Sequence, residues 1–290
     1  MAQKKVKRHL HKGRVACAVL ILIIIIIFIG NIAGCTGKKQ KNPTLPADNS
    51  VTTETASSQP SAEDSQLIIC VDAGHGGSDS GSLANYTTRY EKDDNLSIAL
   101  ATQKYLEEIK DKDNINMQII MTRADDTFVS LDDRCSIAND ANADLFVSLH
   151  RNSAENANGV EVWVHSSEPA PDCRLAYNIL MSLQDVGISK NKGVRFGYIE
   201  DPSLDYQVNR ETNMPSCLVE LGFMSSVDDN ALFDRNVDKY GKAIAQSIVR
   251  TAKELGLKGL KADKKVQPIE TEYYNHEVTD YIPDPSVGNH

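Results

Sequence analysis

Two histidines and two glutamates occupy positions from which side chains could act on a substrate. His75 stands in the glycine-rich segment Gly74–Gly77, directly after an apolar run, and His150 follows a second apolar run. Glu220 ends a third apolar run, whereas Glu91 opens a segment with helical periodicity. Imidazole and carboxylate groups are zinc ligands, and three protein ligands leave a fourth position for water. Two histidines and one glutamate, with a second glutamate free for proton transfer, therefore predict a zinc hydrolase site.

Each of these side chains has an ordinary explanation when it is taken alone. A histidine flanked by glycines can be a simple turn residue, and a glutamate at a helix N-terminus stabilises the helix dipole. A glutamate at the end of a buried strand must either have a hydrogen-bond or ionic partner or serve a function, because burying a free charge is costly. The prediction therefore depends on the set of four and not on one motif.

The elements that must position these side chains alternate between strands and helices. β-branched runs predict strands, and apolar residues that recur on one face predict helices. This alternation favours an α/β sheet with helices on both faces. Open sheets of this kind bind ligands at the carboxyl ends of strands, so we expect His75 and His150 on a shared rim. The expected strands are residues 67–72, 117–122, 145–149, 160–164 and 217–219, and the expected helices lie at residues 96–106, 130–139, 175–183 and 240–255.

The first 35 residues have the pattern of a targeting segment. Residues 1–14 carry six Lys or Arg and no acid, and residues 15–30 are apolar except for Cys17. An apolar stretch of this length can just span a bilayer, but the segment 32–35 (IAGC) also resembles the lipobox of bacterial lipoproteins. We therefore expect anchoring to the cytoplasmic membrane by a transmembrane helix or by a lipidated Cys35. In both cases the basic head stays inside and the rest of the chain lies outside.

Composition divides the remaining chain into three parts. Residues 36–65 are polar, which predicts a disordered linker, and residues 66–260 form the expected catalytic domain. Residues 261–290 turn polar again and are expected to be a disordered tail. The chain has 40 Asp and Glu against 31 Lys and Arg although its head is basic, so its body is acidic. An acidic body argues against nucleic-acid binding.

The cysteines of the body show no metal-binding spacing. None belongs to a CxxC pair. The sequence leaves open whether any two of them form a disulfide. These cysteines are Cys70, Cys135, Cys173 and Cys217.

Seven ordered sequence blocks resemble one family of wall hydrolases. The order GHGG, EKDDNLSIA, TRADD, SLDDRCSIAND, SLHRN, GVEVW and CLVELGF is similar to the zinc-dependent N-acetylmuramoyl-L-alanine amidase family. The resemblance covers about residues 66–257. It implies a single α/β domain around a mostly parallel, six-stranded sheet. It also implies cleavage of the amide between the lactyl group of N-acetylmuramic acid and L-alanine in peptidoglycan. We expect the chain to be a monomer.

The resemblance assigns roles to individual residues. His75, Glu91 and His150 would hold Zn²⁺, and Glu220 would be the general base and acid that acts through zinc-activated water. Asn152 follows a ligand histidine and is expected to reach the substrate. Arg151 stands where the family usually has a small residue, so it could contact the substrate beside the metal or simply face solvent.

Two other functions stay open at this stage. A site with two histidines and one glutamate could belong to a zinc peptidase that cuts within the stem peptide. A non-catalytic wall-binding module on the same scaffold is the second alternative, although such a module would not need all four residues.

Overall fold

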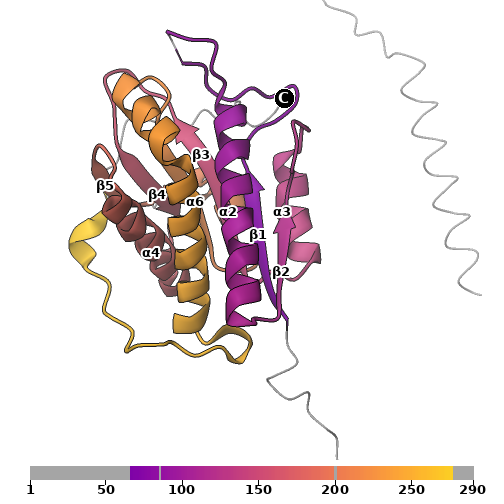
Figure 1. Ribbon diagram of the computed structural model, residues 1–290. Helices are drawn as coiled ribbons and strands as arrows, with labels where there is room; N and C mark the ends of the chain where they lie inside the picture. Colours follow the sequence, from indigo (N-terminus) through magenta and orange to yellow (C-terminus); the bar gives the residue numbers. More distant parts are fainter. Residues whose placement is uncertain (1–65, 85, 199–200, 277–290) are drawn as a thin grey trace, which may run out of the picture. The chain divides into compact units, whose positions relative to one another are not determined.

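The computed structural model describes residues 66–84, 86–198 and 201–276. In this part of the chain, one seven-stranded sheet is covered by helices on both faces (Figure 1). The predicted single α/β domain with a mostly parallel sheet is confirmed, with one strand more than the six expected. The strands are β1 (Leu67–Ala73), β2 (Met117–Met121), β3 (Leu145–Asn152), β4 (Val160–Val164), β5 (Asn191–Phe196), β6 (Ser216–Phe223) and β7 (Tyr274–Asn275). The helices are α2 (Glu91–Asp113), α3 (Leu131–Asp140), α4 (Ala170–Val186), α5 (Gln207–Glu211) and α6 (Val227–Glu254), with 3₁₀ turns η2 (Pro202–Leu204), η3 (Leu257–Gly259) and η4 (Thr271–Tyr273).

The order of the strands brings the functional segments to one edge. The sheet runs β2-β1-β3-β6-β4-β5-β7, and all neighbours are parallel except the antiparallel pair β6 and β4. The strands β1, β3 and β6 are therefore adjacent and point the same way. Residues at their carboxyl ends must lie close together, as the sequence predicted for His75 and His150.

Successive residues of a strand belong to two separate hydrophobic cores, because side chains alternate between the two faces of a sheet. Ile69 belongs to the larger core, which is covered by α2, α4 and α6, with α6 packed against both of the others (Figure 1). Cys70 belongs to a smaller core beneath α3 and α5. The four described cysteines are buried free thiols, so no disulfide forms among them.

Serine side chains cap the N-termini of two helices, α3 and α6. Ser130 caps α3 by accepting a hydrogen bond from the backbone N–H of Asp133 at 3.1 Å. Ser226 caps α6 in the same way through the N–H of Asp229 at 3.2 Å. The last helix therefore begins at Val227, well before the predicted residue 240, because a polar first turn hides its start from an apolar pattern.

Two strands were not predicted. β5 contains Gly193 and two polar residues at its start, so its alternation is weak. β7 lies in residues 261–290, which were predicted to be disordered, and this prediction is wrong for the segment that pairs with β5. Tyr274 packs against Phe196 with ring centroids 5.1 Å apart, a contact that a local polar composition does not reveal. Residues 277–290 lie outside the described residues.

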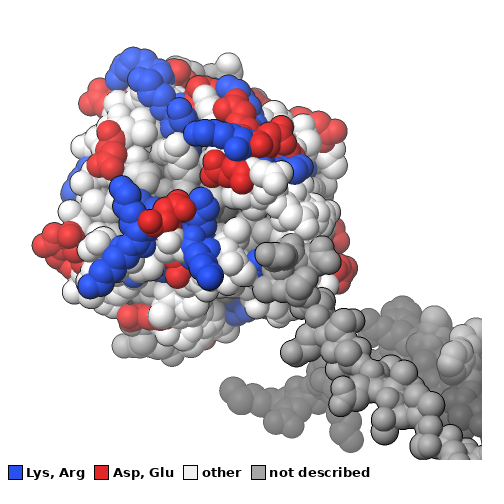
Figure 2. Space-filling view, turned by 60° about the horizontal axis from the view of Figure 1, so that its bottom comes forward, with Lys and Arg blue, Asp and Glu red and all other residues white. Residues whose placement is uncertain are grey.

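Opposite charges are intermixed on the end of the domain that Figure 2 shows. Lys253 lies 3.2 Å from Asp263 and 3.6 Å from Asp113, and Lys258 lies 3.2 Å from Asp144. Such surface pairs contribute at most about 1 kcal/mol each.

Within the described ranges, no helix is both long enough and apolar enough to cross a lipid bilayer. The predicted basic head, membrane anchor and linker, residues 1–65, lie outside these ranges.

Candidate metal centre

His75 lies on a sharp turn that follows β1. The backbone is left-handed at His75, with a φ of 58°, and at Gly77, with a φ of 57°. Glycine adopts this conformation without strain. Two buried guanidinium groups hold this turn. Arg123 donates to the carbonyl of Gly74 at 2.8 Å, and Arg134 donates to the carbonyl of His75 at 2.8 Å. The backbone that carries His75 is therefore fixed from both sides.

Asp79 orients the imidazole of His75. Its Oδ2 lies 2.7 Å from Nδ1, which leaves Nε2 facing Oε1 of Glu91 at 3.3 Å. A carboxylate on the far nitrogen is the usual support of a metal-binding imidazole. Burial alone would lower the pKa of His75, but the carboxylates of Glu91 and Asp79 raise it to about 10. Sequence reasoning missed Asp79, although a carboxylate four residues after a candidate ligand was a visible signal.

His150, near the end of β3, packs directly over Gly74. A Cβ atom at position 74 would lie 2.2 Å from Cε1 and from Nε2 of His150. The absent side chain thus provides the space for the second imidazole. Nδ1 of His150 then lies 3.0 Å from Oε1 of Glu91.

Glu91 is the first residue of α2 and is 3% exposed. Its Oε2 accepts from the backbone N–H of Ser82 at 2.9 Å. Its Oε1 accepts from Nδ2 of Asn95 at 3.1 Å and from the backbone N–H of Arg151 at 3.2 Å. Burial would raise the pKa of Glu91, but His75 and His150 hold it well below its usual value. The carboxylate therefore stays ionised between the two imidazoles.

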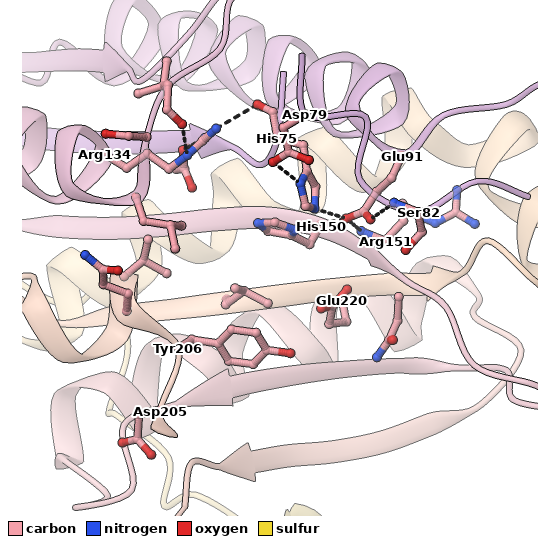
Figure 3. Close-up of a pocket in the computed structure, with 18 of the residues that line it drawn as sticks. His75, Asp79, Ser82, Glu91, Arg134, His150, Arg151, Asp205, Tyr206 and Glu220 are labelled. Carbon is pink, nitrogen blue, oxygen red and sulfur yellow. Dashed lines mark hydrogen bonds and ion pairs between the residues drawn. The ribbon is translucent and has the colours of Figure 1, made fainter. Parts of the chain in front are cut away.

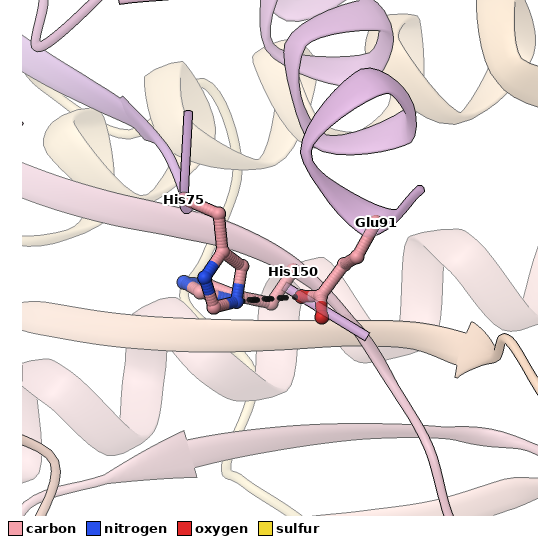
Figure 4. A group of neighbouring side chains, drawn as sticks. All are labelled: His75, Glu91 and His150. Carbon is pink, nitrogen blue, oxygen red and sulfur yellow. Dashed lines mark hydrogen bonds and ion pairs between the residues drawn. The ribbon is translucent and has the colours of Figure 1, made fainter. Parts of the chain in front are cut away.

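These three side chains converge on one point, as Figure 4 shows. One ligand atom from each of His75, Glu91 and His150 lies within 4.8 Å of the others, and the two imidazole centroids are 4.9 Å apart. Two nitrogen donors and one carboxylate oxygen at such spacing form a set that suits Zn²⁺. The donors thus fit a divalent metal ion.

Glu220 lies on β6, beside the cluster. It pairs in register with His150 on β3 and with Glu161 on β4, so these three residues share one face of the sheet. Its side chain is buried, and Oε2 has no hydrogen-bond partner. Burial raises the pKa of Glu220 well above its usual value, and the carboxylates of Glu91 and Glu161 raise it further. A buried carboxyl oxygen without a partner is available for proton transfer.

The cluster and Glu220 line the same cavity, which has a volume of about 300 Å³. Figure 3 shows Glu220 and Tyr206 on one side of His150, with His75 and Glu91 on the other. The far walls of the cavity come from residues 128–131 and 203–208. Sequence reasoning missed the wall formed by residues 203–208, because a short polar turn and a five-residue helix carry little periodicity.

The two predicted substrate residues are both buried. Asn152 lines the cavity and donates to Oε1 of Glu161 at 2.9 Å, so its contact with substrate stays a prediction. The solvent-facing interpretation of Arg151 is wrong, because its side chain is fully buried and lies 2.5 Å from Asp94. A substrate contact by Arg151, which is among the residues that line the cavity, stays a prediction.

Comparisons of sequence point to one family. A sequence model described as N-acetylmuramoyl-L-alanine amidase matches residues 69–250. The "Probable cell wall amidase LytH" of Staphylococcus aureus is 35% identical over 187 residues, which are 62% of this chain and 55% of the relative. The chain thus spans about half the length of the curated relatives that it matches.

Solved structures share the fold. The N-acetylmuramoyl-L-alanine amidase from Clostridium difficile 630 is 30% identical with a TM-score of 0.54, over 64% of this chain and 95% of that chain. The catalytic domain of CwlV, an N-acetylmuramoyl-L-alanine amidase from Bacillus (Paenibacillus) polymyxa var. colistinus, is 30% identical with a TM-score of 0.54, over 65% of this chain and 97% of that chain.

Proposed function

Because the chain belongs to the N-acetylmuramoyl-L-alanine amidase family, we propose that it hydrolyses the amide between N-acetylmuramic acid and L-alanine in peptidoglycan. The observation that carries this proposal is the convergence of His75, Glu91 and His150 beside Glu220 in one cavity. The solved amidases that resemble the chain support the choice of substrate bond.

His75, Glu91 and His150 would hold Zn²⁺ in this site. When bound, the ion would polarise the scissile carbonyl and lower the pKa of water. The remaining chemistry belongs to the protein. Asp79 keeps the His75 ring in place, and the backbone N–H of Ser82 and the amide of Asn95 keep the Glu91 carboxylate in place.

Glu220 would move the proton. Its free Oε2 would take a proton from the attacking water and return it to the departing nitrogen of L-alanine. Its raised pKa suits this role, because a carboxylate with a low pKa takes up a proton poorly.

We place this activity outside the cytoplasmic membrane. The substrate lies there, and the basic and apolar pattern of residues 1–35 supports an N-terminal anchor. The cell-wall relative from Staphylococcus aureus supports the same location.

The decisive experiment is digestion of purified cell wall by the full chain, with mass analysis of the products. An amidase releases peptides with a free L-alanine amine and leaves glycan with the lactyl acid. A chelator should stop the reaction, and added Zn²⁺ should restore it. Cleavage within the stem peptide would instead make the protein a peptidase, and an inert protein with bound zinc would favour a wall-binding role.

The proton-transfer role is tested by Glu220→Gln. The variant should retain zinc and lose turnover by a factor of about 10²–10⁴, the usual contribution of a general base. Zinc content and product formation are measured on the same sample. Full activity in this variant would reject the assignment of Glu220.

A further inference from the structure

Arg151 is a cation buried directly behind the candidate metal centre. Its guanidinium lies 2.5 Å from Oδ2 of Asp94 and 2.6 Å from Oδ1 of Asn230, and it stacks 4.5 Å above the ring of Phe233. A buried charge is tolerated only when it is paired and hydrogen-bonded. Arg151 meets this requirement with partners on two different helices, α2 and α6.

Arg151 joins β3 to the first turn of α2 at two points. Its backbone N–H donates to Oε1 of Glu91 at 3.2 Å, and its side chain pairs with Asp94, three residues further along α2. The same Oε1 lies 3.3 Å from Nε2 of His75 and 3.0 Å from Nδ1 of His150. Movement of α2 relative to β3 would therefore displace the oxygen on which the cluster is centred.

The network continues to the loop that precedes α2. Arg89 donates from Nε to both carboxyl oxygens of Asp94, at 2.9 and 2.8 Å, and its Nη2 lies 2.7 Å from Asp234 on α6. Asp94 thus sits between two guanidinium groups. If Arg151 is replaced by a neutral residue, Asp94 keeps Arg89, so no unpaired charge is left in the core.

We propose that Arg151 is a positioning residue for the metal centre: it holds the start of α2 against β3 and so keeps Glu91 in place for a divalent ion. This inference is based on the proposed function, because it concerns the same three ligands. If Arg151 were only a structural residue, its loss would lower stability without changing how tightly a metal binds.

The test compares metal binding by the full chain and by Arg151→Met. Affinities for Zn²⁺ and Co²⁺ are measured by competition with a chromogenic chelator, and the visible spectrum of bound Co²⁺ reports the ligand geometry. Loss of residues that support ligands typically weakens metal binding by about 10–100-fold, and we expect this range together with an altered Co²⁺ spectrum. Arg151→Lys should recover part of the affinity, because lysine can pair with Asp94 but lacks the planar fork that also reaches Asn230.

Asn178→Ala is the matched control. Asn178 is also a buried polar residue and donates to Oγ1 of Thr251 at 2.9 Å, between α4 and α6. Its replacement should lower the melting temperature and leave the Co²⁺ affinity and spectrum unchanged.

Parent-like Co²⁺ affinity and spectrum in Arg151→Met would overturn the inference, whatever its melting temperature. If this variant does not fold, parent-like values in Arg151→Lys would overturn it, and an affinity below the parent's would support it. A parent chain that binds neither ion would contradict the proposed function as well, so the two failures can be told apart.

Discussion

At the scale of single residues, the absence of a side chain at Gly74 leaves room for a proposed metal ligand. The ring of His150 occupies the space that a Cβ atom at position 74 would need. The ring cannot retreat easily, because β3 is buried between β1 and β6. The glycine is therefore required by the second imidazole.

Gly74→Ala should displace His150 and weaken Zn²⁺ binding by at least about tenfold, the lower end of the range for disturbed metal sites. Zinc content after dialysis at a fixed free concentration measures this effect. Gly187→Ala is the control, because Gly187 has a φ of 109° and a Cβ atom there would meet nothing within 4 Å. It should cost about 1–3 kcal/mol of stability through backbone strain and leave zinc binding intact. Equal zinc content in all three proteins would contradict the steric explanation.

Asp72 is a second residue whose surroundings determine its behaviour. Burial alone would raise the pKa of Asp72, but Arg134 and the hydroxyl groups of Ser148 and Thr122 outweigh it and lower the pKa. Because the pKa is lower in the folded state, the stabilisation is present above the unfolded pKa and is lost as pH falls through the folded one.

Asp72→Asn should therefore lower the free energy of unfolding by about 3–5 kcal/mol at pH 7, since Arg134 loses its buried partner. The difference between variant and parent should shrink once the pH falls below about 4, the unfolded pKa of aspartate. Urea unfolding at several pH values measures it. Asp111→Asn, at an exposed position of α2, should stay within about 0.5 kcal/mol of the parent at every pH. A difference that does not change with pH would speak against the ion pair as the cause.

At the scale of elements, the sequence predicted what local patterns encode. The ends of β1, β3 and β6 were visible because apolar runs stop there, and this predicted that His75 and His150 share a rim. The partners of Arg151 could not be predicted, since they lie on α2 and α6 and depend on how these helices pack. The strand β7 was missed for a similar reason, because its partner β5 is remote in the sequence.

The strand β7 should stabilise the domain without affecting the metal centre. Tyr274 is half-buried against the larger core, and it does not line the cavity that holds His75 and Glu220. Tyr274→Ala should lower the free energy of unfolding by roughly 1–3 kcal/mol, less than the cost for a fully buried aromatic residue. Calorimetry and zinc content measure the two effects. Val266→Ala, at a 36% exposed position, should change stability by less than about 0.5 kcal/mol. An unchanged melting temperature in Tyr274→Ala would mean that β7 adds nothing to the fold.

At the scale of the whole molecule, the proposed ligands join elements that the chain forms at different points. His75 follows β1, Glu91 starts α2 and His150 lies on β3, so one bound ion would connect all three. An ion that binds only the folded state stabilises it by about 2.7 kcal/mol at a concentration of 100 Kd. Metal binding should therefore be measurable as an increase in the free energy of unfolding, independently of any activity.

Zn²⁺ at this excess should raise the melting temperature of the parent by about 5–10 °C, because each kcal/mol shifts a domain of this size by about 2–4 °C. A chelator should reverse the rise, and calorimetry with and without the ion measures it. Glu220→Gln should show the same rise, since that carboxyl group is proposed to act on protons and not on the metal. His150→Ala should show almost none, because two ligands bind the ion too weakly. An equal rise in His150→Ala would mean that Zn²⁺ stabilises the protein from another site, and the three-ligand centre would then lose its support.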